Sequence, residues 1–156
     1  MEIERSENIL NLQLEWVKTA DSKVAPLFAI NIAMLGLLAA LVKLLPSWTI
    51  ATAIFSSITV LLLAMSMLFL ALTMFPRLIG PKESNVFFGG ITKQSEEKYI
   101  LNMPSISDTE YQKDILSQVY RNAEIASSKY ANLKLAFIFT FASAIPWLVA
   151  VYILYV

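Results

Sequence analysis

The last 49 residues, Asp108 to Val156, read DTEYQKDILSQVYRNAEIASSKYANLKLAFIFTFASAIPWLVAVYILYV, and the architecture of the chain depends on this stretch. Residues 108–134 are charged, whereas residues 135–156 carry no charged side chain. Ser107 followed by Glu110 is a capping-box signature that opens a helix. No glycine interrupts residues 108–156, so we predict one helix of about 70 Å, at roughly 1.5 Å per residue. A bilayer core is only about 30 Å thick, so the helix begins in water and ends in lipid.

The charged part of this helix has one apolar face. Its residues recur at steps of three, four and seven, as expected for one buried side of a helix: Tyr111, Ile115, Val119, Ala126, Tyr130 and Leu133.

The composition indicates a membrane protein that is not an enzyme. Of the 156 residues, 57% are hydrophobic and only 15% are charged, against about a quarter charged in soluble domains. The chain has no cysteine and no histidine, which excludes thiol nucleophiles, zinc–thiolate sites and the commonest general base. We therefore expect no catalytic site, no metal site and no cofactor. The formal net charge of +0 argues against a DNA or RNA partner.

The hydrophobic pattern predicts an all-α integral membrane protein with three transmembrane helices, cytoplasmic helical extensions and a small cytoplasmic helical region. The expected parts are an amphipathic N-terminal helix (1–23), transmembrane helices at 24–45, 50–76 and 135–156, and a cytoplasmic sensor region at 77–134. In the sensor region we expect a short helix from Thr92 or Ser95 to Asn102.

The N-terminal helix has a helical apolar pattern of its own. We predict Ser6 as its N-cap and a buried face formed by Ile9, Leu12, Trp16, Ala20 and Val24. Pro26 follows at the junction with the first span, where it either kinks the helix or opens a new one.

The placement of lysine and arginine predicts the orientation. Residues 1–24 hold three of these residues and residues 77–134 hold eight, so eleven of the twelve lie on one side of the spans. Only Lys43 lies on the other side. By the positive-inside rule the N-terminus and residues 77–134 are cytoplasmic.

Several short motifs, in their order around the spans, resemble one family. They are ADSKVA (20–25) before the first span, FPR (75–77), VFFGGI (86–91), SEEKY (95–99), residues 111–118, and Lys129-Tyr130 before the last span. Together they resemble the transmembrane effector of Pycsar antiphage systems, from about Leu14 to the C-terminus.

The resemblance implies a bacterial inner-membrane protein that is activated by a cyclic pyrimidine mononucleotide. The nucleotide, cCMP or cUMP, would come from a partner pyrimidine nucleotide cyclase, and the activated effector would impair the membrane. Because 156 residues leave little room for a closed binding domain, we expect the ligand at a subunit interface of a homo-oligomer.

Two groups of residues in the sensor region are suited to such a ligand. Arg77 can donate two hydrogen bonds to a cyclic phosphate, although it also fits an ordinary positive-inside anchor. Phe87 and Phe88 offer stacking surfaces beside Gly89, where the backbone can approach a ligand closely. Alternatively, both aromatic rings fill the helical core above the membrane.

Further candidates lie on the last long helix. Gln118 and Arg121, on the same side of the last helix as Asp114, can read a base edge and ribose or form ordinary surface pairs. Lys129 and Tyr130 share this ambiguity.

Three further candidates lie on the first long helix. Asp21 and Lys23 lie at the membrane boundary, where they help to form a pocket or are a solvated pair. Asn31, a single amide in the first span, is assigned to membrane packing, with an aqueous path as the alternative.

Two other functions stay open at this point. One is a small structural membrane subunit that binds a partner protein through its cytoplasmic stalk. The other is a membrane enzyme that uses Glu96 and Glu97, but adjacent residues on a helix do not face one another.

Overall fold

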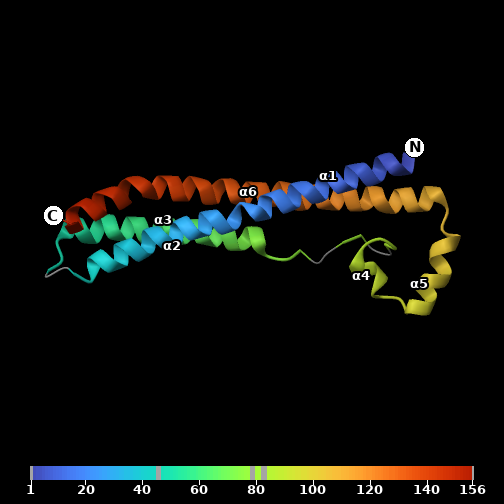
Figure 1. Ribbon diagram of the computed structural model, residues 1–156, viewed down its shortest axis with the longest axis horizontal. Helices are drawn as coiled ribbons and strands as arrows, with labels where there is room; N and C mark the ends of the chain where they lie inside the picture. The colour runs from blue at the N-terminus through green and yellow to red at the C-terminus, as the bar shows by residue number, and fades with distance from the viewer. Residues whose placement is uncertain (1, 45–46, 78–79, 82–83, 156) are drawn as a thin grey trace. The chain divides into compact units, whose positions relative to one another are not determined.

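A computed structural model describes residues 2–44, 47–77, 80–81 and 84–155 of the chain. Every regular element among these residues is helical (Figure 1): α1 (Glu2–Ser22), α2 (Val24–Val42), α3 (Ile50–Met74), α4 (Phe88–Ile91), α5 (Glu96–Asn102), the 3-10 turn η1 (Met103–Ser105) and α6 (Asp108–Tyr155). Within the described parts of the chain, three helical stretches are long and apolar enough to cross a membrane: Glu2–Val42, Ile50–Met74 and Asp108–Tyr155. The predicted fold class is confirmed.

The longest helix, α6, begins at the predicted capping box. The Glu110 N–H donates to Ser107 Oγ at 3.3 Å, and the Ser107 N–H donates to Glu110 Oε2 at 3.2 Å. From there the helix runs without interruption to Tyr155, through Pro146. All six residues of its predicted apolar face are buried or partly buried. The continuous helix expected from the sequence is therefore confirmed.

The first helix begins earlier than predicted, and its predicted buried face is confirmed only in part: Ala20 and Val24 are buried and Ile9 is partly buried. Because α1 begins at Glu2, Ser6 is not its N-cap, and the Ser6 hydroxyl donates to the Glu2 carbonyl oxygen at 3.1 Å. Leu12 and Trp16 are each 49% exposed. Ser6 is 4% exposed and accepts a hydrogen bond from Gln112 Nε2 at 3.3 Å. A polar residue is buried here because α6 supplies its partner.

The helix boundaries follow local chemistry. Lys23 separates α1 from α2, which places Pro26 in the first turn of the new helix, where its missing N–H costs little. The end predicted for this span, residue 45, lies outside the described residues. Phe75 ends α3 with a ψ of 125°, because a residue before proline avoids the helical region. Thr49 and Thr52 form a capping box at the start of α3, a feature that was not predicted from the sequence.

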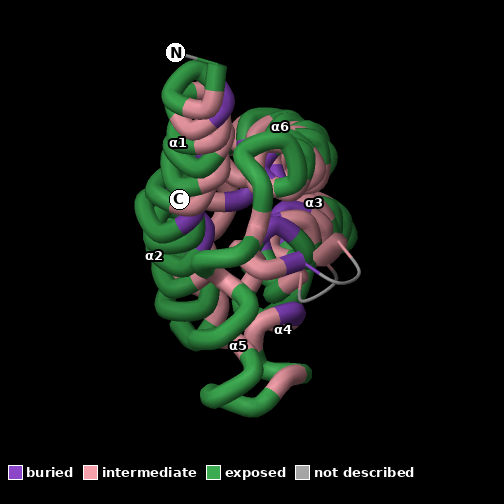
Figure 2. Tube along the Cα trace, turned by 90° about the vertical axis from the view of Figure 1, so that its right-hand side faces the viewer, coloured by how far each residue is buried: buried purple, intermediate pink, exposed green. Residues whose placement is uncertain are grey.

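The chain divides into two compact units. Unit 1 comprises Met1–Thr19 and Pro76–Ser128, and unit 2 comprises Ala20–Phe75 and Lys129–Val156. Figure 2 shows that buried positions recur among exposed ones along the helices. On α3 they follow steps of four and three, the spacing of a coiled-coil seam: Thr52, Ser56, Thr59, Leu63, Ser66, Leu70 and Thr73. Five of these seven carry hydroxyl groups, which suits close helix packing in lipid.

A triangle of hydrogen bonds joins the three helices of unit 2 within the spans. Asn31 on α2 is completely buried. Its Nδ2 donates to Ser66 Oγ on α3 at 2.8 Å, and its Oδ1 accepts from Thr140 Oγ1 on α6 at 2.9 Å. The Ser66 and Thr140 hydroxyl oxygens are themselves 2.8 Å apart. Asn31 therefore packs against the other two spans of its own chain.

An ion pair joins the same bundle at the end where α3 finishes. Lys129 on α6 is 7% exposed. Its ammonium group pairs with the carboxylate of Asp21 and donates to the Thr73 carbonyl oxygen at 2.9 Å. These three residues come from α6, α1 and α3, so this contact also connects three segments of unit 2.

Candidate functional site

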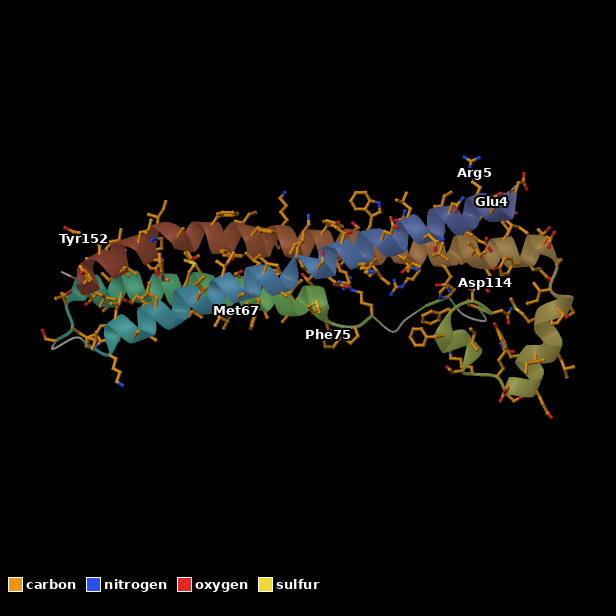
Figure 3. All side chains as sticks on the ribbon, in the orientation of Figure 1. Glu4, Arg5, Met67, Phe75, Asp114 and Tyr152 are labelled. Atoms are coloured by element: carbon orange, nitrogen blue, oxygen red, sulfur yellow. The ribbon has the colours of Figure 1, made fainter. Side chains whose placement is uncertain are left out.

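The segment from Ser84 to Ile91 in unit 1 is attached to α6 by two side chains. Asp114 Oδ2 accepts a hydrogen bond from the Asn85 N–H at 2.7 Å, and Figure 3 shows Asp114 projecting from α6 toward this segment. Gln118 Nε2 donates to the buried Ser84 hydroxyl at 3.0 Å. The same hydroxyl accepts from the Phe87 N–H at 2.8 Å. Ser84 therefore orients the chain that leads into the two phenylalanines.

A close backbone approach within the segment requires glycine. Gly90 lies buried inside α4, and a Cβ atom at this position would collide with the carbonyl oxygen of Ser84. The tight turn brings the rings of Phe87 and Phe88 together, with centroids 4.5 Å apart and planes tilted by 54°. Phe88 remains 57% exposed. Its ring is therefore available to a ligand.

The short helix α5 and the turn before it contact the segment at Asn85. Its N-cap is Ser95, whose hydroxyl accepts from the Lys98 N–H at 3.3 Å. This position matches the second of the two predicted starts. The Tyr99 hydroxyl donates to the Asn85 carbonyl oxygen at 3.1 Å, and Gln94 Nε2 donates to Asn85 Oδ1 at 3.2 Å.

The segment, α1 and α6 enclose a groove of about 390 Å³, which we call the unit 1 groove. It is lined by Leu10, Leu14, Arg77, Val86, Phe87, Phe88, Gln118, Arg121, Asn122 and Ile125. Pockets that bind small molecules in proteins have volumes of roughly 300–1,000 Å³. The unit 1 groove is therefore large enough for a small ligand.

Two guanidinium groups give the groove a positive character. Arg77 donates through its two terminal nitrogens to the Ile125 carbonyl oxygen at 2.9 Å and to Ser128 Oγ at 2.7 Å. Arginine has five N–H donors, so these bonds leave three for other acceptors. Arg121 forms a salt bridge with Glu124 at 2.9 Å. Among the described residues that line the groove none is a carboxylate, so the groove favours an anion.

Another hollow in unit 1 is less suited to a phosphate. It has about 400 Å³ and is lined by Pro81, Asn85, Ile106, Glu110, Tyr111, Lys113, Asp114 and Ser117. Its two carboxylates, Glu110 and Asp114, repel anions. Within the described part of the chain, no cluster of three or more metal-ligating side chains is present.

One tyrosine beside that second hollow has an altered acidity. Burial raises the pKa of the Tyr111 hydroxyl above 10.0, and its hydrogen bond to Glu7 raises the pKa further. The neutral hydroxyl donates to Glu7 Oε1 at 3.0 Å and thereby joins α1 to α6 within unit 1.

The structure brings together five of the predicted ligand residues. Arg77, Phe87, Phe88, Gln118 and Arg121 all line the unit 1 groove.

The other predicted residues lie outside this lining. Gly89 is next to it in the chain, where a Cβ atom would meet the ring of Phe87. Asp21 is paired with Lys129, and Lys23 is exposed. Both belong to unit 2, as does the buried Asn31.

Sequence reasoning missed six residues of this site. Five line the groove and one orients the segment behind it: Leu10, Leu14, Val86, Asn122, Ile125 and Ser84. Asn122 gave a usable signal, because it lies one turn after Gln118 on the same side of α6. The two leucines gave none, because the prediction assigned a different face of α1 to the interior.

One comparison with known proteins identifies a relationship. A family model described as the Pycsar effector protein domain matches residues 5–156. No curated protein and no solved structure matches the chain.

Proposed function

Because the chain belongs to the Pycsar effector family, we propose that this antiphage defence effector is activated by cCMP or cUMP bound in the unit 1 groove. The nucleotide would come from a partner pyrimidine nucleotide cyclase. With its three apolar helices the effector is a membrane protein, and we propose that its activated form impairs the inner membrane.

One observation carries the proposal: the unit 1 groove combines two guanidinium groups with two phenylalanine rings. A cyclic nucleotide presents the complementary groups, an anionic phosphate and a flat base. An arginine fork donates two parallel hydrogen bonds to phosphate oxygens. Base stacking on an aromatic ring contributes about 1–3 kcal/mol, and the exposed ring of Phe88 offers that surface.

The amides of the groove supply the means to recognise a base edge. Gln118 is held by Ser84, and Asn122 Nδ2 donates to the Gln118 carbonyl oxygen at 2.9 Å. The side-chain oxygen of each amide is an acceptor for the exocyclic amine of cytosine, and each amide nitrogen is a donor for a uracil carbonyl. The groove therefore suits either pyrimidine.

Arg77 connects binding to the rest of the chain. A phosphate that recruits its guanidinium competes with the Ile125 carbonyl oxygen and Ser128 Oγ, to which Arg77 donates. Ser128 is followed directly in the chain by Lys129. The ammonium group of Lys129 pairs with Asp21 at the end of α1 and donates to the Thr73 carbonyl oxygen on α3. A ligand that prefers one arrangement of Arg77 would shift the population of the conformations of α6.

The spans contain buried polar side chains, which would draw water into the bilayer if the helices rearranged. The seam of α3 and the Asn31 triangle keep their hydroxyl and amide groups away from lipid. A rearrangement of α6 relative to α3 within unit 2 would break the Ser66–Thr140 and Asn31–Thr140 contacts. Polar groups without partners in lipid attract water, which would make the bilayer permeable.

The first expected result is stabilisation by the ligand. A nucleotide that binds only the folded protein adds RT ln(1 + [L]/Kd), or about 2.7 kcal/mol at 100 times Kd. cCMP or cUMP should therefore raise the thermal unfolding midpoint of the purified protein in detergent, and cAMP and cGMP should raise it much less. Equal shifts with purine nucleotides, or no shift with either pyrimidine, would reject the ligand.

The second expected result locates the ligand in the groove. Arg77→Ala should lower the binding free energy by about 1.5–3 kcal/mol through loss of a charge-assisted hydrogen bond, and Phe88→Ala by about 1–3 kcal/mol. Titration calorimetry with the pyrimidine nucleotide measures both losses. The matched controls are Arg5→Ala and Phe75→Ala, both labelled in Figure 3, because neither is among the lining residues of the groove. Unchanged affinity in folded Arg77 and Phe88 variants would place the nucleotide elsewhere.

The third expected result concerns orientation. Eleven of the twelve lysine and arginine residues lie on the proposed cytoplasmic side, so the N-terminus and residues 77–134 should face the cytoplasm. Reporter fusions at residue 95 should be active only with a cytoplasmic reporter. Activity of a periplasmic reporter at that position would contradict the topology and remove the groove from the side where the nucleotide is made.

A further inference from the structure

An apolar layer separates the ion pair of unit 2 from the hydrogen-bond triangle. On each of the three helical segments, a residue of the ion-pair contact is followed by one or two apolar residues and then by a residue of the triangle: Asp21, Val24, Leu27 and Asn31; Thr73, Leu70 and Ser66; Lys129, Leu133, Ala136 and Thr140. The apolar residues of the three segments pack into one buried cluster, which we call the apolar layer.

The apolar layer is buried and long enough to exclude water. Each of its five residues is at most 7% exposed, and Phe69 and Phe137 pack against it. From the ion pair to the triangle the helices advance about 10–17 Å, at roughly 1.5 Å per residue, which is about a third to a half of the apolar thickness of a bilayer. Water finds no hydrogen-bond partner in a narrow apolar passage, and hydrophobic constrictions close channels in this way.

On the far side of the triangle, buried hydroxyl groups are available to water. Thr59 donates to the Phe55 carbonyl oxygen at 2.8 Å and Ser143 to the Thr140 carbonyl oxygen at 2.6 Å, so both keep acceptor lone pairs. Ser56 is 6% exposed, and among the described residues its hydroxyl has no hydrogen-bond partner. Water inside the bundle would therefore gain hydrogen bonds here without breaking any of these contacts.

We propose that the apolar layer is the hydrophobic gate of a water pathway through the three-helix bundle of unit 2. In the resting protein the layer separates the ion pair from the polar residues beyond it. In the activated protein the layer opens, and water and small solutes cross the bilayer along these polar residues. The inference rests on the proposed impairment of the membrane, and it adds where the membrane opens and which residues keep it closed.

A polar substitution in the layer tests the gate without any nucleotide. Leu70 is 1% exposed, and leucine and asparagine have side chains of the same branching, so Leu70→Asn introduces an amide with little change in shape. The full-length variant is reconstituted into phosphatidylethanolamine–phosphatidylglycerol vesicles that contain a fluorescent dye. Because an amide in the layer binds water, dye release should be at least about tenfold faster than with the natural protein.

Two matched controls separate hydration from loss of packing. Leu72→Asn places the same amide on α3 at a position that is 44% exposed and outside the layer. Leu70→Ala removes side-chain contacts within the layer but adds no polar group. Both controls should retain the dye as the natural protein does. Release from either control as fast as from Leu70→Asn, or no release from Leu70→Asn, would overturn the proposal.

The same test on α6 covers the case in which Leu70→Asn does not fold. Leu133→Asn should release the dye, whereas Leu135→Asn, at a 37% exposed position outside the layer, should not. Equal release from these two variants would overturn the gate. Release that depends on a pyrimidine nucleotide, together with tight vesicles from both layer variants, would retain the proposed function and reject the gate. Leakage from the layer variants without any response to nucleotide would support the gate and reject the proposed ligand.

A single cysteine reports directly whether water passes the layer, since the natural chain has no cysteine. A charged methanethiosulfonate reagent is added on the side that carries residues 77–134, so it reaches Ser56→Cys only through the bundle. Modification of Ser56→Cys should be at least about tenfold faster in the Leu70→Asn background than with Leu70 intact. The neighbouring Ser57→Cys, at an exposed position on α3, should react equally slowly in both backgrounds. Equal rates for Ser56→Cys in the two backgrounds would contradict the pathway.

Discussion

Replacing Gly90 with alanine should abolish the response to nucleotide. A Cβ atom at this position would collide with the backbone carbonyl of Ser84, and backbone cannot move aside as a flexible side chain can. The segment would shift away from α6 and carry Phe87 and Phe88 with it. Because both aromatic walls of the unit 1 groove move, the loss should exceed that of a single stacking contact. We expect a loss of at least about 3 kcal/mol in the free energy of nucleotide binding, measured by calorimetry with the pyrimidine nucleotide.

Gly36→Ala is the matched control for this substitution. A Cβ atom at Gly36 meets nothing within 4 Å, and the residue lies inside α2. Alanine is favoured over glycine in a helix by about 1 kcal/mol, so this variant should be as stable as the natural protein or slightly more stable. Normal nucleotide affinity in a folded Gly90→Ala protein would show that the aromatic segment does not form the binding site.

Asp21→Asn should destabilise unit 2 strongly. The substitution leaves the ammonium group of Lys129 buried without its counter-charge, and breaking a buried ion pair costs about 3–5 kcal/mol. The side chain of Asp21 is 35% exposed, so we expect the free energy of unfolding to fall by an amount at the lower end of this range. Unfolding in mixed micelles by a denaturing detergent measures the change.

Replacing Lys129, the other member of the ion pair, provides the control for this prediction. Lys129→Met should cost less than Asp21→Asn, because the partly exposed carboxylate of Asp21 keeps contact with water. The double variant should be more stable than Asp21→Asn alone, since no unpaired buried charge remains. If the two single losses simply add in the double variant, the pair does not stabilise the bundle in the way described.

The features that could be predicted from the sequence are those decided by residues close together in the chain. The start of α6 follows from Ser107 and Glu110, three residues apart. The end of α3 follows from Pro76, which keeps Phe75 out of the helical region. The three apolar stretches are identified by length and composition. Each of these signals lies within one continuous stretch of the chain, so no distant partner is needed to interpret it.

The features that could not be predicted depend on partners far away in the chain. The buried face of α1 includes Ser6 because Gln112 lies opposite it, and the apolar pattern alone favoured Leu12 and Trp16. Asp21 and Lys129 are 108 residues apart, and either charge alone fits a solvated helix end.

The site was partly predictable because its chemistry is concentrated in few residues. Phe87 and Phe88 are adjacent aromatic residues that can stack on a base, and Arg77 can donate to a phosphate, so these residue types alone indicated ligand contact. The apolar walls contributed by Leu10 and Leu14 depend on how α1 packs in unit 1, and no local pattern indicates that packing.

The most direct test of the central claim is nucleotide-dependent leakage from vesicles that contain only this protein. The purified full-length chain is reconstituted into vesicles loaded with a fluorescent dye, and cCMP, cUMP, cAMP or cGMP is added to the side that carries residues 77–134. The account predicts dye release with at least one pyrimidine nucleotide, little release with the purine nucleotides, and none from Gly90→Ala vesicles. Release that is independent of nucleotide, or intact vesicles despite measured binding of cCMP or cUMP, would contradict it.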